Sequence, residues 1–133
     1  MTQLDTNALV AVAVDALDDI KAQDIRVFDT SKKTSAFERI IVATATRGRQ
    51  TRDMAIHVGR RVKAEGGAVN GMEGTESGEW VLIDLGAVVV HCMQPNIRSY
   101  YNLEELWGSS PVDVKALIAR KAGPVVAHGQ EPA

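Results

Sequence analysis

The chain has 133 residues, of which 45% are hydrophobic, and its formal net charge is −2. This length suits one domain that buries roughly two-thirds of its unfolded surface, so folding requires neither disulfides nor a metal. The single cysteine excludes an internal disulfide, and the sequence has neither a secretory leader nor an apolar run approaching the ~20 residues that span a bilayer. We therefore expect a cytoplasmic protein without membrane contact.

The first part of the chain predicts one helix followed by two strands. Thr6 or Asn7 can cap the helix, which carries an apolar stripe, turns its aspartates outward and ends near Ala22. Residues 25–29 alternate apolar and polar side chains, and residues 39–45 form a β-branched run. A polar turn separates these runs, so we expect adjacent strands.

A second helix is predicted from Thr51 to the stop signal Gly66-Gly67. A short strand at 68–71 and an exposed acidic loop at 72–78 follow it. A second pair of strands is predicted after this loop.

A basic segment precedes the second helix and contains Arg47, Arg49 and Arg52. The free N–H groups and the dipole at a helix N-terminus favour an anion, and the arginines add positive charge. A phosphate of an RNA or of a nucleotide would fit there. The plainer alternative is a solvated basic loop.

Two strand-like runs at 80–85 and 88–93 flank Gly86-Ala87, which predicts a tight β-hairpin with a type II′ turn. A two-residue loop fixes the register outward from Leu85 opposite Val88, and side chains then alternate between two faces. The wholly apolar face, which must be core, contains Val81, Ile83, Leu85, Val88, Val90 and Cys92. The mixed face contains Trp80, Leu82, Asp84, Val89, His91 and Met93.

Pro95 opens a third helix, and Asn102 with Glu105 forms a capping pattern for a last short turn. Residues 1–108 therefore form the predicted domain. Beyond them the composition shifts toward Pro, Ala, Gly and Gln, which predicts a C-terminal tail at 109–133, with a short helix at 111–122 followed by disorder.

The element order predicts a mixed α/β fold. One mixed β-sheet of about five strands would carry helices packed mainly on one face. The hairpin face with Trp80 and Met93 would then lie open, unless the third helix or the tail covers it. Of Tyr100 and Tyr101, one should face the sheet and the other should be exposed.

The hairpin does not have the pattern of an active site. His91 and Cys92 are neighbours on a strand and point to opposite faces, so they cannot activate each other. Asp84 lies diagonally within reach of His91, which favours a structural or interface pair over a catalytic one. Neither metal-ligand spacing nor a phosphate-binding loop occurs, so we expect no catalytic residues, no metal and no cofactor.

The mixed face instead has the composition of a protein-binding surface. Trp80 and Met93 are large apolar anchors, and Asp84, His91 and the acidic loop with Glu73 form a charged rim. The alternative, a nucleotide-binding or nucleotidyltransferase-like enzyme, would have to use Asp84 and the basic segment.

Four motifs occur in a fixed order: LDDIKAQDI at 17–25, EG at 73–74 ahead of WVLIDLG at 80–86, VVVHCM at 88–93, and YNLEELW at 101–107. Together they closely resemble the ribosomal silencing factor family, also called Iojap. The resemblance covers roughly residues 6–108.

The resemblance implies a factor that binds the large ribosomal subunit through ribosomal protein L fourteen, blocks subunit joining and represses translation under nutrient limitation. It also implies a nucleotidyltransferase-like fold without the active site. Carried over by matching position, the partner-binding residues are Glu73, Trp80, Asp84, His91, Met93 and Tyr101. The exposed apolar face further predicts a homodimer when the protein is free.

Overall fold

The computed structural model describes residues 4–107 and 111–112. In chain order the elements are α1 (Thr6–Asp19), β1 (Gln23–Asp29), β2 (Arg39–Thr44), α2 (Gly48–Ala64), β3 (Gly71–Glu73), β4 (Trp80–Asp84), β5 (Val88–Met93), α3 (Pro95–Tyr101), α4 (Leu103–Trp107) and β6 (Pro111–Val112). The strands form one sheet in the order β3-β4-β5-β2-β1-β6, in which β2 and β5 are parallel and the other neighbours antiparallel. The predicted mixed α/β class is confirmed.

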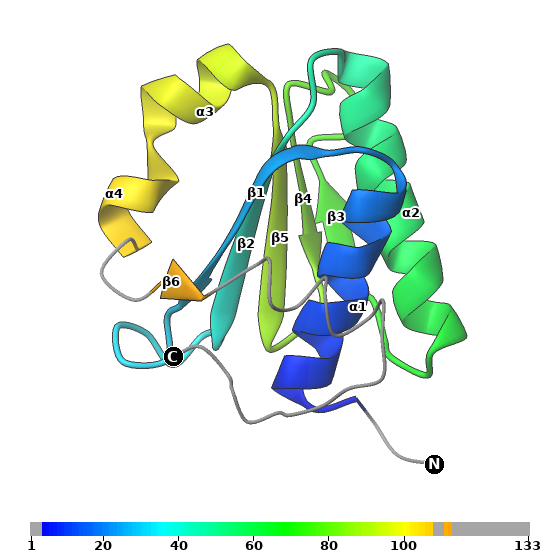
Figure 1. The fold of residues 1–133 in the computed structure, drawn as a ribbon, viewed down its shortest axis with the longest axis vertical. Coiled ribbons are helices and arrows are strands. Elements are labelled where there is room, and N and C mark those ends of the chain that lie inside the picture. The colour runs from blue at the N-terminus through cyan, green and yellow to red at the C-terminus, as the bar shows by residue number, and fades with distance from the viewer. Residues whose placement is uncertain (1–3, 108–110, 113–133) are drawn as a thin grey trace.

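The two long helices, α1 and α2, lie on one face of the sheet, and α3 and α4 lie on the other side (Figure 1). Leu17 of α1, Met54 of α2 and Ile83 of β4 are fully buried in the main core between these helices and the sheet. Burial of each such side chain contributes about 1.5–3 kcal/mol. The core therefore lies on the α1 and α2 face, as the sequence predicted.

The N-terminus of α1 lies one position earlier than predicted. Asp5 is the N-cap, and its side chain accepts a hydrogen bond from the Ala8 N–H at 2.8 Å. The predicted cap at Thr6 or Asn7 was therefore wrong. A carboxylate at this position accepts the hydrogen bond and also interacts favourably with the helix dipole.

Asp15 of α1 is buried, although the sequence predicted that the aspartates of this helix face outward. Its Oδ2 lies 2.7 Å from Nη2 of Arg61 in α2, and Nη1 of the same guanidinium lies 2.7 Å from Oδ2 of Asp19. The buried carboxylate is compensated by this pairing, because a lone buried charge would be strongly destabilising. The ion pairs therefore join α1 to α2.

α2 begins at Gly48 rather than at the predicted Thr51, and it ends at Ala64, just before the predicted stop at Gly66-Gly67. Thr51 lies within the first turns, where its hydroxyl donates to the Arg47 carbonyl oxygen at 2.9 Å. The helix thus includes part of the basic segment.

The hairpin of β4 and β5 has the predicted register. Trp80 lies opposite Met93, and the Leu85 N–H donates to the Val88 carbonyl oxygen at 2.9 Å. Gly86 opens the loop with a φ of +92°, a conformation that glycine adopts without a Cβ clash. All six residues of the predicted core face are buried in the main core: Val81, Ile83, Leu85, Val88, Val90 and Cys92.

Short strands extend both edges of the sheet. The strand predicted at 68–71 lies later than expected: β3 spans Gly71–Glu73 and pairs with β4, so it includes the first two residues of the predicted acidic loop. At the other edge β6 pairs with β1, so the predicted helix does not begin at residue 111. Val112 packs against the main core there, and the pairing satisfies backbone groups of the β1 edge. The rest of that predicted helix and the predicted disorder lie outside the described residues.

Candidate functional site

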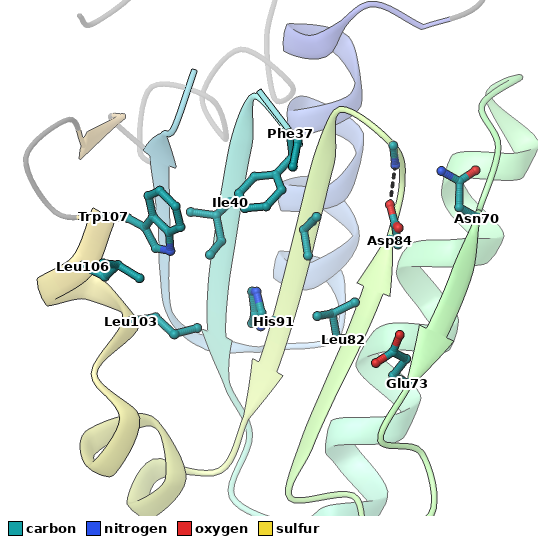
Figure 2. Close-up of a pocket in the computed structure, with 13 residues that line it drawn as sticks. Phe37, Ile40, Asn70, Glu73, Leu82, Asp84, His91, Leu103, Leu106 and Trp107 are labelled. Atoms are coloured by element: carbon teal, nitrogen blue, oxygen red, sulfur yellow. Dashed lines mark hydrogen bonds between the residues drawn. The ribbon is translucent and has the colours of Figure 1, made fainter. Parts of the chain in front are cut away.

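A groove with a volume of about 730 Å³ opens on the sheet face that points away from α1 and α2. Figure 2 shows apolar side chains along one side of it, polar side chains along the other, and His91 between them. The apolar wall comes from α4 and consists of Leu103, Leu106 and Trp107. The polar wall consists of Asn70, Glu73 and Asp84. The floor includes Ile40, Leu82, Val89 and His91.

Arg98 of α3 fixes α3 and α4 against the sheet. It is 6% exposed, and its Nη1 donates to the Asp24 carbonyl oxygen at 2.7 Å and to Thr44 Oγ1 at 2.6 Å. Its Nη2 and Nε donate to Glu104 Oε2 at 2.8 and 3.1 Å. Since charge-assisted hydrogen bonds are stronger than neutral ones, this side chain determines where α4 lies.

The α4 wall was missed by the sequence reasoning. Leu103 and Trp107 are partly buried against the sheet, whereas Leu106 is 59% exposed. The Trp107 ring meets Phe37 edge-on at 5.7 Å, and Lys33 Nζ donates to the Leu106 carbonyl oxygen at 2.9 Å. The spacing of Leu103, Leu106 and Trp107 predicts a shared helix face, because residues three and four apart lie side by side, but it does not predict where that face lies on the sheet.

Met93 was predicted on the open face, but it is fully buried. It packs with Phe28, Ile40 and Val42, and Ile97 of α3 covers this cluster. The cause is local: α3 begins at Pro95, so the chain folds back over the end of β5 at once. The third helix thus covers Met93, as the alternative interpretation held, while the groove stays open.

Trp80, His91 and Tyr101 come together beside the groove. Trp80 Nε1 donates to His91 Nδ1 at 2.9 Å, and the Tyr101 ring lies 4.8 Å from the Trp80 ring, centroid to centroid. Tyr101 remains 52% exposed and Tyr100 is 80% exposed. The tyrosine that contacts the sheet is therefore Tyr101. Burial lowers the pKa of His91 to about 4, so the imidazole is neutral at neutral pH.

The predicted pairing of His91 with Asp84 was wrong. Asp84 Oδ1 accepts a hydrogen bond from the Gly86 N–H at 2.8 Å, within its own turn. Trp80 and Asp84 are both diagonal to His91 across the hairpin, and the larger indole ring spans the distance. Asp84 also lines the groove. Within the described residues only Oδ1 of its carboxylate accepts a hydrogen bond, so Oδ2 can meet a ligand or solvent.

Arg52 of the basic segment contacts the acidic loop. Its Nη1 donates to the carbonyl oxygens of Thr75 and Glu76 at 3.2 and 3.4 Å. Arg47 and Arg49 are exposed at the start of α2. Arg52 thus helps to hold the acidic loop, and the anion or RNA contact of the three arginines stays a prediction.

Cys92 is buried in the core, as predicted, and burial raises the pKa of its thiol to about 12. A thiol in this environment is a packing residue rather than a nucleophile. Within residues 4–107 and 111–112, no three carboxylate, imidazole or thiol groups meet as a metal site would require. No helix in the same part of the chain is long and apolar enough to cross a bilayer.

Comparison with known proteins identifies the family. Residues 3–131 match the family described as "Ribosomal silencing factor during starvation". A ribosomal silencing factor from Chromobacterium violaceum is 53% identical over 97 residues, which is 73% of this chain and 80% of that protein. A crystal structure from the same organism superposes with a TM-score of 0.77 at 43% identity, covering 94% of each chain.

A more distant relative is the mouse protein named "Mitochondrial assembly of ribosomal large subunit protein 1", which is 26% identical over 89 residues. The match covers 65% of this chain and 39% of the mouse protein. The family match spans nearly the whole sequence and includes all four motifs of the resemblance. The chain therefore belongs to the ribosomal silencing factor family.

Proposed function

We propose that this chain is a non-enzymatic, cytoplasmic factor that binds the large ribosomal subunit through ribosomal protein L fourteen. Its bulk then blocks joining of the small subunit, which represses translation under nutrient limitation. Family membership and the name of the mouse relative support a ribosome-associated role. The observation that carries the proposal is the open groove, whose apolar wall and acidic rim face solvent.

The groove suits a protein surface better than a small polar substrate. Leu106 offers a large exposed apolar side chain, and Glu73 and Asp84 provide negative charge on the opposite side. An apolar anchor region with charge at its rim is the usual anatomy of a protein interface, and the acidic rim favours a basic partner surface. Ribosomal proteins that contact RNA commonly have such basic surfaces.

The proposed contact residues follow from this geometry. Glu73, Asp84 and His91 line the groove, while Trp80 and Tyr101 stack beside it. Met93, by contrast, supports the surface from below. Arg47 and Arg49 are candidates for an additional ribosomal RNA contact, which would appear as a steeper salt dependence of the same binding reaction.

Trp80→Ala is expected to weaken binding to isolated large subunits by about thirtyfold, because truncating an interface tryptophan typically costs ~2 kcal/mol or more. Co-sedimentation with isolated large subunits measures this change in affinity. Ile56→Ala is a matched control, since Ile56 is an exposed apolar residue on α2, across the sheet from the groove. Leu106→Ala tests the same surface with little risk to folding.

Two results would contradict the proposal. The parent chain could fail to travel with large subunits, or Trp80→Ala and Leu106→Ala could both bind like Ile56→Ala. Thermal melting of each variant shows whether a loss of binding reflects a loss of structure.

We also infer that the free protein forms a homodimer through the groove face, because exposed apolar surface favours self-association. Analytical ultracentrifugation should show a dimer that releases one copy when large subunits are added. A dimer that remains intact on the subunit would place the dimer contact elsewhere.

A further inference from the structure

His91 has one nitrogen whose hydrogen-bonding role is already fixed. The indole N–H of Trp80 can only donate, so His91 Nδ1, 2.9 Å away, must be the acceptor and must lack a proton. A neutral imidazole then carries its proton on Nε2. The pair therefore selects one tautomer of His91.

The second nitrogen, Nε2, belongs to a side chain that lines the groove and is only 8% exposed. Among residues 4–107 and 111–112, no acceptor is hydrogen-bonded to it. Its labelled neighbours in Figure 2 include Leu82 and Leu103, which cannot accept a hydrogen bond. Nε2 is not one of the fully buried polar atoms, so solvent reaches it through the groove. A ligand that fills the groove displaces that solvent and must supply an acceptor in its place.

The orientation of the donor is set by its surroundings. Trp80 holds Nδ1, and Tyr101 packs on the Trp80 ring at 4.8 Å. Burial keeps the ring uncharged, with a pKa of about 4. A fixed donor loses little conformational entropy on binding, which is how preorganised sites gain affinity.

We propose that the His91 Nε2–H group is a fixed hydrogen-bond donor that binds a carbonyl oxygen of the partner protein in the groove. This inference rests on the proposed function and adds a residue that determines specificity. Glu73 and Asp84 line the same groove, so their negative charge disfavours a phosphate or carboxylate as the acceptor. A neutral carbonyl oxygen of a protein segment fits both the donor and the acidic rim.

Two substitutions separate the donor from the rest of the side chain. His91→Asn keeps an acceptor near the Nδ1 position for Trp80 but removes the donor from the groove. His91→Gln extends an amide N–H to about the Nε2 position. We expect His91→Asn to bind the purified partner protein and large subunits about tenfold more weakly, and His91→Gln to recover most of the loss.

The tautomer itself is read by nitrogen-15 NMR of the full chain, through the couplings of the ring protons to each ring nitrogen. A protonated Nε2 and an unprotonated Nδ1 are expected, and a proton on Nδ1 would overturn the inference. Equal binding of the parent and His91→Asn would also overturn it while leaving the proposed function intact. If the loss occurs only with large subunits and not with the purified protein partner, the acceptor belongs to RNA and the inference is wrong.

Failure of the parent to bind large subunits would instead refute the proposed function, and the carbonyl contact with it. The NMR spectrum still decides the tautomer in that case, so the two failures are distinguishable.

Discussion

Acidification from about pH 7 to about pH 4 is expected to remove about 3 kcal/mol of folding free energy through His91. The ordinary histidine pKa of 6.5 applies to the unfolded chain, and burial lowers the folded value to about 4. Between these values the unfolded state binds more protons, so stability falls as the pH falls. The contribution is complete above the unfolded pKa and is lost as the pH drops toward the folded pKa.

Urea denaturation at several pH values in this window measures the effect. His91→Asn is the control, because it keeps an acceptor for Trp80 but cannot titrate. Carboxylates also titrate near the acid end, and they do so in both proteins. The difference between the two pH profiles therefore isolates His91, and parallel profiles would contradict its burial as a neutral group.

Gly74→Ala is expected to destabilise the fold by about 3 kcal/mol. Gly74 begins the acidic loop after β3 with a φ of +85°, where an L residue costs about 1–2 kcal/mol. A Cβ at this position would also overlap the backbone oxygen of Trp80, so the loop or β4 must shift. Overpacking of this kind costs roughly another 1–3 kcal/mol.

Gly71→Ala is the matched control, because Gly71 lies on the neighbouring strand β3 and a Cβ there meets no atom within 4 Å. Thermal or urea unfolding should leave Gly71→Ala within about 0.5 kcal/mol of the parent. Similar stabilities of the two variants would show that the loop does not approach Trp80 so closely. Because the same contact positions Trp80, Gly74→Ala should also weaken ribosome binding.

The hairpin could be predicted residue by residue because its constraints are local. A two-residue loop at Gly86-Ala87 sets the register, and the alternation of apolar side chains decides which face is buried. The two long helices follow from local signals as well, although their first residues depend on which side chain reaches the free N–H groups. Asp5 rather than Thr6 does so in α1.

The groove could not be predicted, because its wall depends on contacts between distant parts of the chain. Arg98 reaches the Asp24 carbonyl oxygen and Thr44, which are 74 and 54 residues away in sequence. Nothing in the local pattern of α3 indicates that this arginine is buried. The position of α4 follows from that anchoring, because Arg98 Nη2 also donates to Glu104 of α4.

The partner of His91 was mispredicted for a similar reason. Trp80 and Asp84 are both diagonal neighbours of His91, and the Gly86 turn competes with His91 for a hydrogen bond to Asp84. The Gly86 N–H engages Asp84, which leaves the Trp80 indole to meet the imidazole.

Strand β4 has one buried face and one partly exposed face. Val81 and Ile83 are buried in the core, whereas Trp80, Leu82 and Asp84 are partly exposed on the opposite face. Substitutions at alternate positions therefore have different consequences, for folding at Val81 and Ile83 and for the proposed partner contact at Trp80, Leu82 and Asp84. Under the proposed function, the exposed face of β4 can diverge between species while the interior stays unchanged, so the contact surface can change without loss of the fold.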